Sequence, residues 1–145
     1  MRIAILDDYQ GAFESLGFAQ RLTGHDVVSF QDTVRGEALV QRLQGFEGVV
    51  LTQQRSALPA EVIARCASLR FIAQTGRNTN HLDLKACEQA GITVSASGLG
   101  SPFAPAELTW ALILASRRNL LQEVTGFKAG HWQATLGTGL HGKTL

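Results

Sequence analysis

The sequence has few cysteines, few prolines and almost no excess of charge, and these shortages exclude several classes of protein. Its 145 residues include two cysteines, Cys66 and Cys87, which lie too far apart for a Cys-x-x-Cys motif. We therefore expect small buried thiols in a reducing compartment. Three prolines, in a chain that is 45% hydrophobic and 17% charged, do not fit a collagen-like or disordered protein.

Charge and hydropathy also provide no basis for binding nucleic acid or a membrane. The net charge is +1, with lysine and arginine scattered along the chain. The N-terminal MRIAILDDYQ has a single cation and a short apolar stretch before two aspartates, unlike a signal peptide or a membrane span. The four histidines lack metal-ligand spacing. We expect a cytoplasmic protein without a metal site and without nucleic acid or membrane partners.

What the sequence does contain is an alternation of apolar runs and helical patterns. The predicted strands are 2–6, 26–30, 47–52, 69–73 and 92–96. The runs lack polar alternation, which is typical of parallel strands buried on both faces. Helices are predicted around 10–22 and over 35–43, 59–66 and 82–90, the last with Asp83 as its N-cap. The pattern predicts an α/β fold, a flavodoxin-like doubly wound sheet of five parallel strands.

Polar residues gather where three of these strands end. Ligands of an open parallel sheet bind beyond the carboxyl ends of its strands. We therefore expect the loops 7–10, 53–56 and 74–78 to share one edge. The glycine at position 76 would let the backbone approach an anion, and arginines there suit a carboxylate. The alternative is a plain polar connection in which asparagines shape a turn. The candidate site residues in these loops are Gln53, Gln54, Gln74, Gly76, Arg77 and Asn78.

The acidic pair Asp7 and Asp8 raises a second possibility, a receiver-type signalling domain. Receiver chemistry also requires an aspartate at the end of the third strand and a lysine at the end of the fifth. The sequence has LTQQR and VSASG in those places. We therefore interpret Asp7 and Asp8 as turn or cap residues, and the receiver domain is the least favoured function.

A different pattern begins after residue 100. The segment SPFAPAELTWALILASRRNLL (101–121) predicts a long helix whose middle is apolar nearly all the way round. Such a helix must be covered on several sides. Because the predicted sheet has little room to cover it, we expect it to pack against a missing domain or a second copy, as in a homodimer. Residues 126–145 are predicted to be glycine-rich connecting chain.

Three segments of the sequence together resemble one known family. They are QTGRNTNHLDL (74–84), AGITVSASGLGSPFAPAELTWALILASRRN (90–119) and AGHWQATLGTGLHGKTL (129–145). They are similar to segments of the D-isomer-specific 2-hydroxyacid dehydrogenases, the phosphoglycerate and formate dehydrogenase kind. The resemblance implies that residues 1–100 form a flavodoxin-like substrate-binding domain. It also implies that residues 101–145 form a crossing helix and a linker toward an NAD-binding Rossmann domain outside this sequence.

The resemblance also implies roles for the candidate residues. Gln53, Gln54 and Gln74 match positions that select the distal end of the substrate. Gly76 matches the first glycine of a Gly-x-Gly that holds the substrate carboxylate, and Asn78 replaces the second. Arg77 matches a position that touches substrate or nicotinamide, so it is a candidate for both substrate and cofactor binding. No residue is expected to be catalytic, since the family's arginine, glutamate and histidine would lie beyond residue 145.

The activity that the resemblance implies is hydride transfer between NAD or NADP and a small 2-hydroxy or 2-keto acid. A histidine would act as acid and base, and an arginine would polarise the carbonyl. The 145 residues alone are expected to bind no cofactor and to be inactive. The alternative from another class is a non-catalytic module that binds a small carboxylate or a protein, as the corepressor relatives of the family do.

Overall fold

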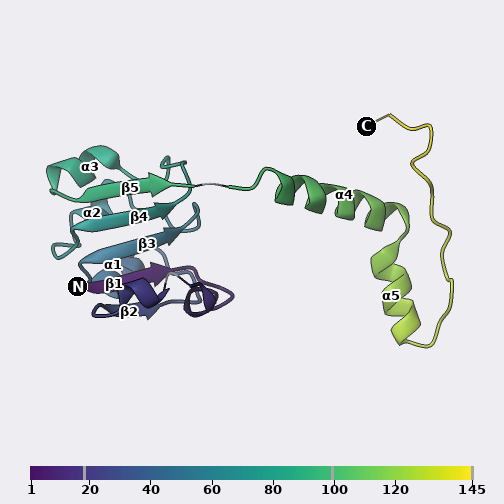
Figure 1. Cartoon of the computed structure of the whole chain (residues 1–145), viewed down its shortest axis with the longest axis horizontal. Coiled ribbons are helices and arrows are strands. Elements are labelled where there is room, and N and C mark those ends of the chain that lie inside the picture. The colour runs from purple at the N-terminus through teal and green to yellow at the C-terminus, as the bar shows by residue number, and fades with distance from the viewer. Residues whose placement is uncertain (18, 99, 145) are drawn as a thin grey trace. The chain divides into compact units, whose positions relative to one another are not determined.

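The computed structural model describes residues 1–17, 19–98 and 100–144, and the chain divides into two units, Met1–Leu99 and Gly100–Leu145. The first unit contains a sheet whose five arrows point the same way (Figure 1). All strand pairs are parallel, in the order β2-β1-β3-β4-β5. The predicted α/β fold with flavodoxin-like topology is confirmed. The strands are β1 (Arg2–Leu6), β2 (Asp26–Ser29), β3 (Gly48–Thr52), β4 (Phe71–Thr75) and β5 (Thr93–Ser97).

Three helices cover one face of this sheet. They are α1 (Glu37–Leu43), α2 (Ala60–Ile63) and α3 (Leu84–Gln89). Because side chains alternate along a strand, the buried Leu6, Leu51 and Ile72 point to the same face and join these helices in one core. On the opposite face Phe71 is 36% exposed and Val50 is half-buried. The sequence predicts that both faces of the strands are buried. The face under the helices is buried, and the opposite face is partly exposed.

The predicted helix around 10–22 is wrong, since this segment forms two short 3₁₀ turns, η1 (Phe13–Ser15) and η2 (Ala19–Leu22). The carboxylate of Asp8 accepts hydrogen bonds from the backbone N–H groups of Ala12 (2.8 Å) and Phe13 (3.1 Å). Side-chain bonds of this kind compete with helix formation. Gly11, at φ +60°, also leaves the helical region. Asp8 therefore holds the turn that follows β1, in agreement with its interpretation as a turn or cap residue.

Strand β4 lies two residues later in the chain than predicted. Gln74 pairs with Leu51 of β3 and with Ala96 of β5, so the ladder continues through it on both sides. The apolar run ends at position 73, but the backbone of a central strand keeps its pairing regardless of side-chain polarity. Gln74 and Thr75 therefore belong to the strand, and the loop begins at Gly76.

Two smaller predictions in the first unit are confirmed. The side chain of Asp83 caps α3 by accepting a hydrogen bond from the Ala86 N–H group at 2.9 Å. Cys66 and Cys87 are free and buried, and burial raises the pKa of both thiols. Thiols with raised pKa values react poorly, which fits a packing role.

The second unit consists of α4 (Phe103–Arg117), α5 (Leu120–Lys128) and the segment that follows them (Figure 1). The helix predicted over 101–121 is present as α4 but ends at Arg117, because Asn119 adopts a left-handed conformation at φ +50°. The chain predicted to be irregular from residue 126 is helical as far as Lys128. Neither helix has a buried residue, and Leu112 is 62% exposed. No helix among the described residues has the length and hydropathy needed to span a membrane.

Candidate functional site

The loops that follow β1, β3 and β4 meet at the carboxyl edge of the sheet, as the sequence predicts. Arg55 donates from Nη1 to the carbonyl of Asp7 at 2.7 Å, and its guanidinium lies 4.6 Å from the ring centroid of Tyr9. These contacts join the β1 and β3 loops. Gln54 joins the β3 and β4 loops, since its Nε2 donates to the carbonyl of Asn78 at 3.4 Å.

Arg77 is the exposed cation of this edge. Among the described residues, its guanidinium has no hydrogen-bond or ion-pair partner. The backbone N–H groups of Arg77, Asn78 and Thr79 likewise donate to no acceptor in the described parts of the chain. Successive free N–H groups next to a guanidinium can donate hydrogen bonds to a carboxylate, because none of these donors has an acceptor among the described residues.

Gly76 shapes the start of the loop after β4. Its own N–H group is not available to a ligand, because it donates to the carbonyl of Ser97 at 2.7 Å. This bond extends the β4–β5 ladder by one residue. A Cβ at Gly98 would lie 3.0 Å from the Cα of Gly76, so the two backbones approach closely. Gly76 itself has φ +131°, a conformation that favours glycine.

Asn78 both shapes the turn and stands at the candidate site. Its Oδ1 accepts a hydrogen bond from the N–H group of Asn80 at 2.9 Å, which forms an Asx turn. This is the plain structural role that the sequence also suggests. Asn78 is exposed and follows Arg77 directly in the loop.

Gln74 is buried, unlike the other candidate side chains. It is 3% exposed, and its Nε2 donates to the carbonyl of Gln53 at 2.9 Å. Its Oε1 contacts Nε2 of His81 at 3.0 Å. Gln53 is exposed and adopts a left-handed conformation at φ +55°. The prediction that Gln74 touches substrate stays a prediction, and its polar atoms already have partners within the protein.

Two further residues, Thr75 and His81, organise this edge, and neither is among the candidates that the sequence suggests. The hydroxyl of Thr75 donates to the carbonyl of Leu51 and accepts from the N–H group of Gln53, both at 2.9 Å. A correct strand register would have indicated Thr75, since it ends β4 opposite Thr52. No signal in the sequence pairs His81 with Gln74.

The acidic pair makes its hydrogen bonds within the first unit, although Oδ2 of Asp7 is buried without a partner among the described residues. Asp7 is 1% exposed, and its Oδ1 accepts a hydrogen bond from the Thr33 hydroxyl. Burial raises the pKa of Asp8, but the N–H groups of Phe13 and Ala12 and the hydroxyl of Ser29 outweigh it and bring the pKa below its usual value. Asp8 is therefore an ionised carboxylate that holds the loop after β1.

The described residues do not fit a metal or the pyrophosphate of a dinucleotide. They contain no cluster of three or more His, Cys, Asp or Glu side chains that could hold a metal ion. The stretch GTGLHG (137–142) has Gly-x-Gly-x-x-Gly spacing, but it follows irregular chain where a dinucleotide site needs a strand. A Cβ at Gly137 would lie 3.1 Å from the carbonyl of Arg117, so this glycine serves close packing against α4.

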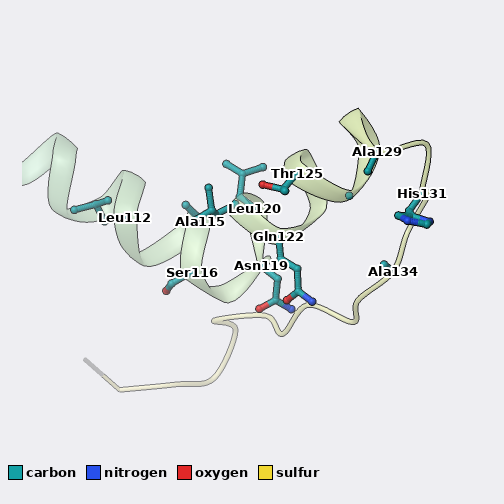
Figure 2. Close-up of a pocket in the computed structure, with 12 residues that line it drawn as sticks. Leu112, Ala115, Ser116, Asn119, Leu120, Gln122, Thr125, Ala129, His131 and Ala134 are labelled. Atoms are coloured by element: carbon teal, nitrogen blue, oxygen red, sulfur yellow. The ribbon is translucent and has the colours of Figure 1, made fainter.

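A hollow in the second unit lies elsewhere and contains none of the candidate residues. It has a volume of about 830 Å³ and lies between α4, α5 and the segment near Ala134 (Figure 2). Figure 2 shows Leu112, Ala115 and Leu120 along the helices, and His131 on the following segment. His131 is the single acidic or basic side chain among the residues that line this hollow. It is the inner side of the bend at Asn119.

Comparison with known proteins agrees with this fold. A sequence model described as the D-isomer specific 2-hydroxyacid dehydrogenase, catalytic domain, matches residues 3–136. The D-3-phosphoglycerate dehydrogenase of Homo sapiens is 32% identical over 124 residues, which are 84% of this chain and 23% of that protein. That of Archaeoglobus fulgidus is 32% identical over 110 residues, 74% of this chain and 21% of the relative. The chain thus spans about a quarter of the length of these curated relatives.

A solved structure of a similar protein also resembles this chain. The phosphoglycerate oxidoreductase of Vibrio cholerae O395 is 46% identical and superimposes with a TM-score of 0.92. The match covers 99% of this chain and 47% of the solved one. On the strength of the family match over residues 3–136 and this likeness, the chain belongs to the D-isomer specific 2-hydroxyacid dehydrogenases and corresponds to their catalytic domain.

Proposed function

We propose that the complete protein is an NAD(P)-dependent 2-hydroxyacid dehydrogenase, and that the carboxyl edge of this sheet binds the substrate. The reaction would oxidise the CH–OH group of a small 2-hydroxy acid or reduce the 2-keto acid. The observation that carries the proposal is the unpartnered guanidinium of Arg77 beside free N–H groups at the end of β4. Relatives named as phosphoglycerate dehydrogenases support the reaction class.

The residues of this chain bind and orient in this proposal. Arg77 holds the substrate carboxylate, with the N–H groups of Arg77 and Asn78 as further donors, and Gly76 provides the backbone shape that exposes them. Gln53 and Gln54 contact the distal end of the substrate. Neutral amides at these two positions favour an uncharged distal group over a phosphate. The nicotinamide, when bound by the complete protein, supplies or accepts the hydride, and in this proposal Arg77 contacts it as well.

The experiment is a turnover assay on the complete protein. Pyruvate, hydroxypyruvate and glyoxylate are each offered with NADH and with NADPH, and loss of nicotinamide absorbance is followed. Turnover of at least one acid, with none of the matching 2-keto amide, is the expected result, because the amide lacks the carboxylate that Arg77 binds. Equal turnover of acid and amide would contradict the proposed site, and no turnover of any acid would contradict the function.

We also propose that the protein is a homodimer in the cytoplasm, with α4 covered by the second copy. The support is the exposed apolar surface of α4, on which Leu108 and Leu112 are 60% and 62% exposed. A helix that is apolar nearly all the way round must be buried against other protein surfaces. Buried free thiols at Cys66 and Cys87 fit a reducing compartment. Sedimentation of the complete protein tests the dimer, and a monomer at high concentration would contradict it.

A further inference from the structure

The side chain of Gln74 connects two loops from inside the protein. It is one residue from the end of β4, on the face that carries the core, and is 3% exposed. A buried primary amide is costly unless both its oxygen and its nitrogen have partners. Both do: the nitrogen faces the carbonyls of Gln53 (2.9 Å) and Thr75 (3.4 Å), and the oxygen faces His81 (3.0 Å).

These partners determine which atom donates at each contact. A backbone carbonyl can only accept, so the NH₂ group of Gln74 must be the end that faces Gln53. The oxygen of Gln74 then faces Nε2 of His81, which must carry a proton. We call this pair of hydrogen bonds, from His81 to Gln74 and from Gln74 to Gln53, the amide bridge. The bridge requires a proton on Nε2, and burial, which lowers the pKa of His81, favours the neutral form of the ring.

The residue at the end of the amide bridge has an unfavourable backbone conformation. Gln53 sits at φ +55°, in the left-handed region that a side chain with a Cβ rarely adopts. Both of its backbone polar groups are held by β4, since its N–H group donates to the Thr75 hydroxyl and its carbonyl accepts from Gln74. A strained backbone persists only where its surroundings determine it. The next residue, Gln54, reaches the carbonyl of Asn78.

We propose that Gln74 and His81 are positioning residues, which hold Gln53 and Gln54 in the conformation that meets the distal end of the substrate. The inference rests on the proposed function, because it assigns a task to residues behind the same site. In this proposal Gln74 does not touch the substrate but acts through Gln53, whereas the other candidate residues touch the substrate. His81 follows the site loop in sequence and supports it through its hydrogen bond to Gln74.

The test compares two glutamines that undergo the same substitution in the complete protein. Gln74→Leu removes the amide bridge. Gln44→Leu is the matched control, because Nε2 of Gln44 also joins two carbonyls, those of Val40 (3.2 Å) and Arg65 (3.0 Å), far from the site edge in sequence. With hydroxypyruvate and NADH as probes, we expect Gln74→Leu to raise KM about tenfold with kcat changed less than about twofold. Gln44→Leu should change neither constant, even where it lowers Tm.

Backbone NMR gives a readout that does not depend on turnover. In ¹⁵N-labelled complete protein, Gln74→Leu and His81→Phe should shift the amide resonances of Gln53 and Gln54, and His81→Gln, which keeps an N–H donor, should shift them less. Unchanged Gln53 and Gln54 resonances in Gln74→Leu would overturn the inference. If Gln74→Leu shifts these resonances but the wild-type protein turns over no 2-keto acid, the amide bridge is upheld and the proposed function is overturned instead.

Discussion

Replacing Arg77 by alanine separates a binding role from a structural one. Because the guanidinium is exposed and has no partner among the described residues, its removal should change the free energy of unfolding by less than about 0.5 kcal/mol. A hydrogen bond to a charged group contributes about 1.5–3 kcal/mol. At about 1.4 kcal/mol for each factor of ten, the loss predicts a fall of roughly 10- to 150-fold in kcat/KM.

The strand itself provides the matched control. Arg70 precedes β4 and Arg77 follows it, both are exposed, and neither guanidinium has a partner within the described residues. Arg70→Ala should leave kcat/KM and Tm unchanged, because it lies at the amino end of the strand. Arg77→Lys keeps the charge but loses the planar fork, so its kcat/KM should be intermediate. The assay is steady-state reduction of hydroxypyruvate with thermal unfolding in parallel. Equal kcat/KM values for Arg77→Ala and Arg70→Ala would refute the reasoning.

Two further predictions concern the loops around the site. The pKa of Asp8 is lowered in the folded state, so its contribution to stability is complete above about pH 4 and is lost as pH falls through the folded pKa. Urea unfolding should therefore show Asp8→Asn less stable than wild type at pH 7, by about 1–3 kcal/mol, and the difference should shrink below pH 4. Gly98→Ala would place a Cβ 3.0 Å from the Cα of Gly76. We expect it to cost about 1–3 kcal/mol in thermal unfolding, whereas Gly100→Ala, which meets nothing within 4 Å, should be neutral, and equal Tm values for the two would contradict this.

The topology of the first unit could be predicted because its signals are local. Five apolar runs with helical segments between them are sufficient for a parallel sheet, and the end of each strand places its loop at a known edge. The meeting of Arg55 with Asp7 and of Gln54 with Asn78 follows from that rule alone. The role of Asp83 as an N-cap can likewise be predicted from the helical residues that follow it.

The errors arise where long-range contacts outweigh local pattern. The sequence ends the fourth strand at its last apolar residue, but pairing with β3 and β5 carries the strand through Gln74. Burial of that amide depends on a histidine seven positions away, and no periodicity reports such a partner. The break at Asn119 is another example, since its side chain bonds the hydroxyl of Thr135 and the carbonyl of Leu136, which the helix pattern does not contain.

The most direct test of the substrate site is a crystal structure of the complete protein grown with oxamate, an unreactive analogue of a 2-keto acid. We expect the oxamate carboxylate within hydrogen-bond distance of the Arg77 guanidinium and of the N–H groups at Arg77 and Asn78, with the amide end toward Gln53 and Gln54. Oxamate bound with its carboxylate on other residues, while Arg77 still faces solvent, would contradict the account.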